Sequence, residues 1–389
     1  MNWAARQGAL GEALAACRPL WHAQPFCEVR PAWSAIHPAL TAELLALDDA
    51  AAEHFNGDGA AARGLVARHV PQVAVFDDLL ALAPPPPAPA PEPGRFWDWE
   101  IPGRKRSQIV AFAGAARPSG RPLLDWCAGK GHLGRLLALH WQVPATSLDR
   151  DATLCAEGEA LARRSGATQR FVTADALQAE DRLGPDQHVV ALHACGDLHR
   201  HALVAGAERG VAAFDLAPCC YHRGVLAHYR PLAATSGLAL TRDDLRLAVT
   251  ETVTASARLA RQRDRAMAWK LGFDAWRRSI EGDAYRPFRS LPASWLRLPF
   301  AECCAHLSRR EGLPAPGDGD AAVCEAAGWR RQREVLRLSI LRHAFRRALE
   351  VWLVGDLAVA LEEKGYRVAV HEFCPRAVTP RNLLLSARR

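Results

Sequence analysis

The stretch that most constrains the fold is PLLDWCAGKGHLG, residues 122–134. A short apolar strand carries an acid, Asp125, and passes into a glycine-rich turn and then a helix. Gly129 and Gly131 allow a ligand to approach the backbone, because they have no side chain and tolerate a positive φ. The helix that follows presents unpaired backbone N–H groups. This order predicts an α/β fold that binds a nucleoside cofactor.

Two cofactors compete for this turn. The spacing Gly129-x-Gly131-x-x-Gly134 also satisfies the dinucleotide fingerprint, in which a pyrophosphate lies at the end of the helix. Asp125, four residues before the first glycine, favours a different ligand. A carboxylate at a strand tip repels a pyrophosphate but attracts the ammonium group of S-adenosylmethionine. A dinucleotide-binding fold is the weaker alternative.

Acids also end the next two predicted strands. Residues 143–149 end at Asp149, from which such folds hydrogen-bond the ribose hydroxyls. Residues 169–175 end at Asp175, which would meet the adenine amino group of S-adenosylmethionine. Each acid has an alternative role as a helix N-cap. Three acids in register, with strands and helices alternating between them, are hard to explain by capping alone.

Two further apolar runs, residues 187–197 and 211–222, predict strands covered on both faces. Because ligands bind outside the carboxyl ends of such strands, we expect their last residues to converge beside the cofactor. A helix over 332–364 and strands over 366–373 and 382–387 predict a closing hairpin, which dinucleotide folds lack. The residues expected to converge are His193, Cys195, Asp197, Cys219, Cys220, Tyr221 and His222.

Three short motifs together resemble a known family. They are GKGHL (129–133), HACGDL (193–198) and PCCYHR (218–223), and they are similar to the paired-cysteine family of methyltransferase-domain proteins. That family is related to the ribosomal RNA adenine dimethylase domain-containing proteins and to acceptor-stem tRNA 2′-O-methyltransferases. The resemblance covers residues 103–223 and the final hairpin. It implies a Rossmann-like class I methyltransferase sheet of seven strands with a closing antiparallel hairpin, S-adenosyl-L-methionine as cofactor, and RNA as substrate class.

The strand positions and the resemblance give two sets of expected site residues. Methyl transfer mainly needs the reactants positioned and a proton removed, so His193 or His222 is the expected proton acceptor and Tyr221 the expected stacking residue. The expected catalytic set is His193, Cys219, Cys220, Tyr221 and His222. The expected cofactor-binding set is Lys105, Gln108, Asp125, Ala128, Gly129, Lys130, Gly131, His132, Leu133, Asp149, Asp175, Ala176, His193 and Cys195.

The paired cysteines have three readings. A thiolate activated by a neighbouring histidine would add to a pyrimidine ring. Cys195, Cys219, Cys220 and a histidine would suit zinc, although adjacent cysteines are poor chelating geometry, and we expect no metal. The thiols would otherwise be small apolar fillers of a tight pocket. The chain has 11 cysteines, and their placement in predicted core strands indicates reduced thiols rather than a disulfide framework.

Composition divides the chain into five expected segments. Residues 1–82 predict an N-terminal helical domain, and residues 83–95 a stiff proline-rich linker. Residues 96–223 are the expected first part of the methyltransferase core, 224–328 a basic helical insertion, and 329–389 the last helix and hairpin of the core.

Charge is distributed unevenly along the chain. The formal net charge is +7 overall, −4 over residues 1–95 and +8 over residues 242–349. A basic segment suits a phosphate-bearing partner. The arginine run over 257–265, followed by cations interleaved with aromatics over 269–278, suits RNA. Two other readings compete. The bias of 45 Arg against 4 Lys suggests a GC-rich coding sequence, and aromatics at helical spacing suggest a buried helix face.

No apolar run reaches the roughly 18 residues that span a bilayer, and the start lacks the layout of a signal peptide. We therefore expect a cytoplasmic protein without a membrane partner, and the sequence leaves its oligomeric state open. The expected activity is methylation of tRNA or rRNA. The alternatives are methylation of a protein side chain or a small molecule, and a non-catalytic module that binds S-adenosylmethionine or RNA.

Overall fold

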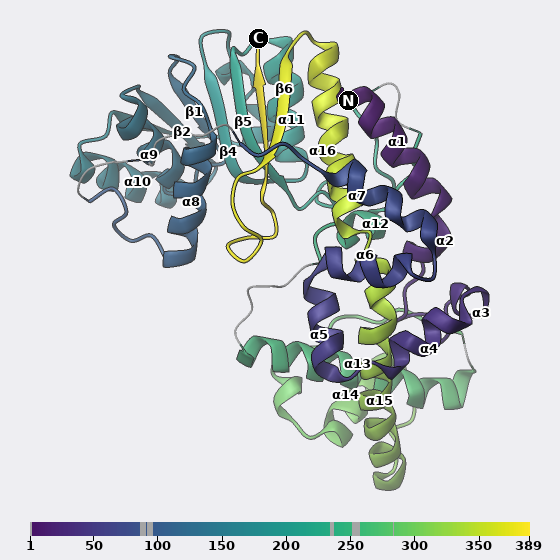
Figure 1. Cartoon of the computed structure of the whole chain (residues 1–389). Coiled ribbons are helices and arrows are strands. Elements are labelled where there is room, and N and C mark those ends of the chain that lie inside the picture. The colour runs from purple at the N-terminus through teal and green to yellow at the C-terminus, as the bar shows by residue number, and fades with distance from the viewer. Residues whose placement is uncertain (1, 86–90, 92–95, 234–236, 251–256, 283) are drawn as a thin grey trace. The chain divides into compact units, whose positions relative to one another are not determined.

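Seven strands form one sheet in the computed structural model of the chain (Figure 1). Their order is β3-β2-β1-β4-β5-β7-β6; β1 to β5 are parallel, and β7 runs antiparallel between β5 and β6. The expected Rossmann-like sheet of seven strands with a closing antiparallel hairpin is confirmed. The strands are β1 (Leu123–Trp126), β2 (Ala145–Asp149), β3 (Gln169–Thr173), β4 (His188–Cys195), β5 (Ala213–Cys219), β6 (Arg367–Glu372) and β7 (Leu383–Arg388).

The structure describes residues 2–85, 91, 96–233, 237–250, 257–282 and 284–389. Most of the predicted linker, residues 86–90 and 92–95, lies outside the described residues.

The chain divides into two compact units. The sheet unit comprises residues 1–16, 75–253 and 346–389, and the helical unit comprises residues 17–74 and 254–345. These boundaries differ from the five expected segments, because the predicted N-terminal domain is shared between the two units. Its first helix belongs to the sheet unit, and residues 17–74 join residues 254–345, which comprise most of the predicted insertion and the start of the last predicted segment.

Helices cover both faces of the sheet. The connection through α9 (His132–Trp141) leads from β1 to β2, and the connection through α11 (Asp197–Glu208) leads from β4 to β5 in the opposite direction across the sheet. Because such crossovers are right-handed, the two helices lie on opposite faces. On the α9 side, α8 (Gly103–Ala115) adds Ile109 and Phe112 to an apolar cluster with Leu136 and Val190.

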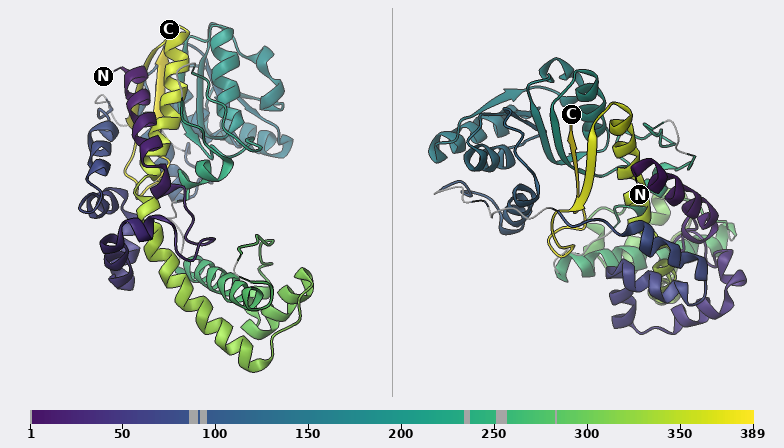
Figure 2. Two further views of the ribbon diagram at one scale, coloured as in Figure 1. Left: turned by 90° about the vertical axis from the view of Figure 1, so that its right-hand side faces the viewer. Right: turned by 45° about the horizontal axis from the view of Figure 1, so that its top comes forward.

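Helix α16 (Arg346–Glu363) packs against α11 and against the closing hairpin. Helix α1 (Trp3–Ala16) lies beside α16 and buries Leu10 and Leu14 fully (Figure 2). This burial explains why the first residues belong with the sheet. The sheet unit also contains α7 (Val75–Leu80), α10 (Ala152–Ser165), η2 (Ala176–Gln178), η3 (Glu180–Arg182) and α12 (Arg242–Leu247).

The helix expected over residues 332–364 is two helices. Helix α15 (Asp318–His343) belongs to the helical unit and α16 to the sheet unit, with a break at Ala344 and Phe345. Both residues at the break are fully buried. No glycine or proline stands there, so the break has no local sequence signal of the kind that ends most helices.

The helical unit has its own apolar core between α13 (Ala257–Glu281), α14 (Phe300–Glu311) and α15. Trp269 and Phe273 are buried in it, which confirms the buried-face reading of the interleaved aromatics. The other helices of this unit are α2 (Arg18–Trp21), α3 (Trp33–Ile36), α4 (Pro38–Ala46), α5 (Asp49–Gly57), α6 (Gly59–Ala67), η1 (Pro71–Ala74) and η4 (Trp295–Arg297).

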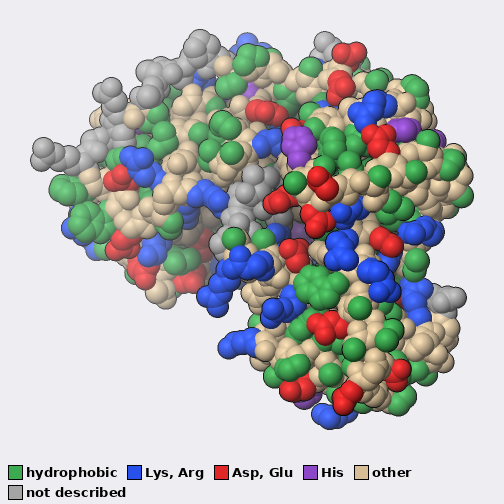
Figure 3. Space-filling model, turned by 60° about the horizontal axis from the view of Figure 1, so that its bottom comes forward, with side chains coloured by type: hydrophobic (Ala, Val, Ile, Leu, Met, Phe, Trp, Pro, Cys, Tyr) green, Lys and Arg blue, Asp and Glu red, His purple; other side chains and the backbone are tan. Residues whose placement is uncertain are grey.

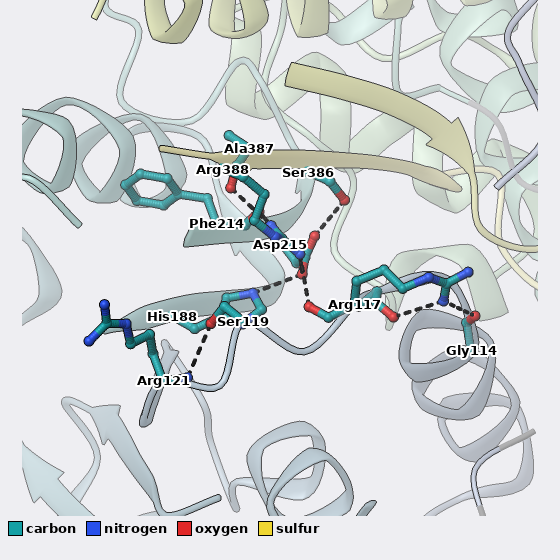
Figure 4. A network of polar contacts seen from close by, with 11 residues as sticks. Gly114, Arg117, Ser119, Arg121, His188, Phe214, Asp215, Ser386, Ala387 and Arg388 are labelled. Carbon is teal, nitrogen blue, oxygen red and sulfur yellow. Dashed lines mark hydrogen bonds and ion pairs between the residues drawn. The ribbon is translucent and has the colours of Figure 1, made fainter. Parts of the chain in front are cut away.

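A buried polar network ties the hairpin to the parallel strands (Figure 4). Asp215 of β5 is fully buried and accepts hydrogen bonds from His188 Nε2 at 2.8 Å and Arg388 Nη2 at 2.7 Å. Arg388 also donates to the carbonyl oxygen of Arg117 at 2.9 Å. Burial alone would raise the pKa of Asp215, but the hydrogen bond and charge of His188 and the charge of Arg388 hold it below its ordinary value. Because His188 begins β4, this network lies away from the carboxyl ends of the strands and serves stability.

Candidate cofactor pocket

A cavity of about 360 Å³ lies at the carboxyl ends of the parallel strands, within the sheet unit. The order of strands reverses between β1 and β4, and ligands of open α/β sheets bind at this switch point. The cavity is lined by Cys127, Asp149, Arg150, Asp175, Ala176, Leu177, Cys195, Asp197, Leu198, Arg223 and Gly224.

The glycine turn after β1 places the start of α9. Gly131 has a φ of +62°, and a Cβ there would lie 2.4 Å from Gln169 Nε2 and 2.5 Å from Phe171 Cζ. A Cβ on Gly134 would lie 2.9 Å from Asp125 Oδ2. These two glycines therefore let α9 pack closely on the strands. A Cβ on Gly129 would meet nothing within 4 Å among the described residues, so its backbone faces open space.

Asp149 and Asp175 both line the cavity, as expected. Asp149 Oδ2 accepts a hydrogen bond from the Gly129 backbone N–H at 2.7 Å, which couples the acid to the glycine turn. Asp175 accepts from the Leu177 N–H at 3.0 Å and so caps η2. Asp175 therefore both caps η2 and lines the cavity.

Asp125 is placed differently from the expectation. It lies inside β1, its side chain is buried, and it accepts hydrogen bonds from the Gly134 N–H at 2.9 Å and Ser147 Oγ at 3.4 Å. Burial raises its pKa to about 7. The carboxylate therefore lies under the start of α9. Cys127 follows the end of β1, has a φ of +59° and lines the cavity in place of the acid.

Several residues of the turn and the start of α9 support the pocket without lining it. Lys130 forms ion pairs with Glu157 at 2.7 Å and Glu100 at 3.3 Å. His132 and Leu133 are buried in the packing of α9. Burial, together with the charge of Arg135, lowers the pKa of His132 to about 3. The expected cofactor residues that the structure brings to the cavity are Asp149, Asp175, Ala176 and Cys195, whereas Lys105, Gln108, Asp125, Ala128, Gly129, Lys130, Gly131, His132, Leu133 and His193 lie outside its lining.

His193 is held in a defined tautomer at an irregular point of β4. It has a φ of +72°, and the pairing of β4 with β5 shifts register between Leu192 and Cys195. The amide of Gln108 donates to the Val378 carbonyl oxygen at 3.3 Å, so its Oε1 accepts from His193 Nε2 at 2.8 Å. Desolvation of the ring and the charge of Lys105 lower the pKa of His193. The ring is therefore neutral near pH 7, with Nδ1 as a proton acceptor.

The cysteines at the ends of β4 and β5 form one cluster. Cys195 Sγ and Cys219 Sγ are 3.4 Å apart, and the sulfurs of Cys195, Cys219 and Cys220 all lie within 4.8 Å of one another. Hydrogen bonds from the thiols of Cys195 and Cys219 lower the pKa of Cys220. Hydrogen bonds with Cys195 and Cys220 raise the pKa of Cys219. We call these three residues the thiol cluster.

Tyr221 and His222 follow the thiol cluster. Tyr221 is buried, packs edge-on against His199 and lies 3.4 Å from the Pro218 carbonyl oxygen. Its ring is therefore not accessible for stacking on a base. His222 is half-buried, and desolvation lowers its pKa.

Sequence reasoning missed Arg150, Leu177, Leu198 and Arg223 in the cavity lining. Arg150 follows Asp149 directly, so its position after the acid that ends β2 could have predicted that it lines the cavity. Leu177 is 45% exposed, which is unusual for a large apolar side chain beside a cavity and fits contact with a flat apolar ligand group. Leu198 lies in the first turn of α11 and Arg223 on the loop after β5, and the approach of both to the pocket depends on tertiary packing.

A family model described as a methyltransferase domain matches residues 106–224. This span contains the glycine turn, the thiol cluster and the three acids that line the cavity, Asp149, Asp175 and Asp197. No curated protein matches the chain significantly. Two similar solved structures are the cyclopropane synthase MmaA2 from Mycobacterium tuberculosis and the 23S rRNA methyltransferase ErmE. The synthase is 13% identical to this chain, and the match covers 73% of this chain and 82% of the synthase with a TM-score of 0.25. ErmE is 16% identical, and the match covers 60% of this chain and 97% of ErmE with a TM-score of 0.23.

No helix in the described part of the chain combines the length and the apolar character needed to cross a membrane.

Proposed function

We propose that the chain is an S-adenosylmethionine-dependent methyltransferase that acts on RNA. The observation that carries the first part is the meeting of Asp149 and Asp175 in one cavity beside the glycine turn, within a segment that matches a methyltransferase domain. Three acids line this cavity, the third being Asp197. The PCCYHR segment supports placing the chain with the paired-cysteine methyltransferases.

The lining residues fit the parts of this cofactor. Asp149 would hold the ribose hydroxyls, and Asp175 with Leu177 would hold the adenine. Arg150 and Arg223 supply positive charge for the methionyl carboxylate. When bound, the cofactor supplies a methyl group activated by its sulfonium.

This chain's own contribution to the reaction is positioning and proton removal. His193 Nδ1 is the proton acceptor that the hydrogen bond to Gln108 leaves open. Desolvation of the ring, together with the charge of Lys105, lowers the pKa of His193 and keeps the ring neutral. An exchangeable proton on a substrate oxygen or nitrogen therefore has an acceptor beside the pocket.

Exposed arginines on the helical unit support RNA as substrate. Arg258, Arg261, Arg263 and Arg265 are exposed along the first turns of α13. Among the described residues, Arg258 and Arg261 have no acidic side chain within ion-pair distance. Figure 3 shows a face on which Lys and Arg side chains lie among scattered Asp and Glu side chains. Exposed arginines like those at the start of α13 bind phosphates through charge and counterion release.

The test is transfer of a labelled methyl group from S-adenosylmethionine to separated tRNA, rRNA, protein and small-molecule fractions by the full-length protein. The proposal expects label in an RNA fraction and a rate that falls steeply with salt. His193→Ala should slow transfer by about 100-fold or more without weakening cofactor binding. Label in the protein or small-molecule fraction would overturn RNA as substrate, and no transfer to any fraction would favour a binding module.

A further inference from the structure

The thiol cluster is built by two neighbouring strands. Cys195 and Cys219 are paired in register at the ends of β4 and β5, and Cys220 is the next residue along the chain. Cys219 is buried, whereas Cys195 and Cys220 are half-buried. Cys195 also lines the cavity, so the cluster is accessible from the cofactor pocket.

Adjacent cysteines in an extended strand point to opposite faces, which is why the pair seemed poorly suited to chelation. The structure removes this objection. Cys220 has a φ of +48°, and this left-handed turn ends the strand and brings its sulfur to the same side as Cys219. Such a conformation costs a non-glycine residue on the order of 1–3 kcal/mol and persists at functional sites. His193, two residues before Cys195, has the same handedness.

The spacing of the three sulfurs fits a tetrahedral metal. Zinc bonds thiolate sulfur at about 2.3 Å, so two sulfurs on one tetrahedral zinc lie about 3.8 Å apart. The three sulfurs of the cluster lie within 4.8 Å of one another, and one pair is at 3.4 Å. Shifts of less than about 1 Å in side-chain position would therefore complete the set.

The surroundings suit a thiolate-rich metal site. Arg223 and His222 act electrostatically on Cys220, and a cation beside the cluster offsets the excess negative charge of three thiolates on a divalent ion. His222 Nδ1 is buried and has no hydrogen-bond partner among the described residues. A buried polar atom of this kind is normally paired.

We propose that Cys195, Cys219 and Cys220 bind one Zn²⁺ ion as three thiolates. Three protein ligands leave one position for water, for a further ligand or for substrate, as in catalytic zinc sites. Binding releases the thiol protons to solvent. The site is independent of the proposed methyl transfer, since it requires neither cofactor nor substrate to form.

The experiment uses the reduced full-length protein, freed of metal and titrated with Co²⁺ and then Zn²⁺. We expect one Co²⁺ per chain, thiolate-to-cobalt charge-transfer absorption, the strong visible bands of a tetrahedral site, and displacement by Zn²⁺. Cys195→Ala should weaken binding by about 100-fold or more, since even outer partners of metal ligands are worth about 10- to 100-fold. Cys219→Ala/Cys220→Ala should abolish binding.

The matched control is Cys303→Ala/Cys304→Ala, which removes the other adjacent pair of the chain and should bind Co²⁺ as the parent protein does. Circular dichroism and thermal unfolding report whether each variant is still folded. Calorimetry of the parent protein with S-adenosylmethionine tests the cofactor proposal separately, so failure of one proposal is distinguished from failure of the other. Absence of stoichiometric Co²⁺ binding by the parent protein would overturn the zinc site. Retention of the charge-transfer band in a folded Cys219→Ala/Cys220→Ala variant would overturn it as well.

Discussion

The chain contains two pairs of adjacent cysteines, and the pairs differ in backbone conformation, burial and acidity. Cys219 and Cys220 end a strand, and a left-handed residue brings both sulfurs to Cys195. Cys303 and Cys304 lie in α14 and are fully buried in the apolar core of the helical unit. The same dipeptide is thus a polar cluster beside a pocket in one unit and a space filler in the other.

The difference shows in the acidity of the thiols. Hydrogen bonds from neighbouring thiols lower the pKa of Cys220, whereas burial raises the pKa of Cys303 to about 11 and that of Cys304 to about 12. Thiolate character therefore follows backbone conformation and polar neighbours rather than the CC motif. A paired-cysteine motif indicates a site only where the backbone converges on other polar groups.

The largest expected effect is on alkylation of the metal-free protein. Cys220 should react with iodoacetamide at least about 100-fold faster than Cys303 or Cys304, because only the thiolate attacks and the helix pair is buried. Its rate should rise less steeply between about pH 6 and pH 8 than that of an ordinary thiol, which gains about tenfold per pH unit, because the pKa of Cys220 is lowered. Mass spectrometry of tryptic peptides after short exposure measures each site. Equal labelling of both pairs would contradict the greater thiolate character of Cys220.

Two glycine substitutions should each change the alkylation of one cysteine pair and leave the other pair unchanged. A Cβ on Gly196 would lie 2.1 Å from the Arg223 carbonyl oxygen, and one on Gly272 would lie 2.8 Å from the Cys324 carbonyl oxygen. Gly196→Ala should slow alkylation of Cys220 by disturbing the loops around the thiol cluster, and Gly272→Ala should expose Cys303 and Cys304. Each should cost about 3 kcal/mol.

Gly319→Ala is the control for these substitutions, because a Cβ there meets nothing within 4 Å among the described residues. Its alkylation pattern should match that of the parent protein. Opening of both pairs by Gly196→Ala would mean that the two units do not respond separately.

A pH effect should be confined to the sheet unit. The pKa of Asp125 is raised from 3.8 to about 7, so the folded state holds its proton more tightly than the unfolded state. The stability from this group is full below about pH 4 and is lost as pH rises through about 7, by about 4 kcal/mol at most. Asp125→Asn should flatten this dependence, because its amide oxygen still accepts from Gly134.

Hydrogen exchange of β1 and β2 amides at several pH values measures this effect, with Asp186→Asn at an exposed site as control. A slope in the parent protein that is unchanged in Asp125→Asn would show that the carboxyl group is not the source.

The smallest expected effect is on the stability of the helical unit. Cys303→Ala/Cys304→Ala should destabilise it by about 2 kcal/mol, because two fully buried sulfurs are lost from a packed core. Cys220→Ala should cost less, because its side chain is half-buried. Thermal unfolding followed by calorimetry measures both. A larger loss for Cys220→Ala would indicate that the thiol cluster is a structural element.

The sheet, its hairpin and two of the three acids could be predicted from the sequence, because alternating strands and helices with acids at strand ends are local signals. The placement of the Asp125 side chain could not, since its hydrogen bond to the Gly134 N–H depends on how α9 packs on β1. The joining of residues 17–74 with 254–345 depends on packing between helices distant in sequence. The burial of Tyr221 and the turn at Cys220 likewise depend on backbone geometry that residue types do not specify.

The most direct measurement of the central claim is calorimetric titration of the full-length protein with S-adenosylmethionine and, separately, with a nicotinamide dinucleotide. The account predicts one S-adenosylmethionine per chain, binding weakened about 100-fold by Asp149→Asn through loss of charged hydrogen bonds, and no change with Asp186→Asn. Binding of the dinucleotide in its place, or S-adenosylmethionine binding that is indifferent to Asp149→Asn, would contradict it.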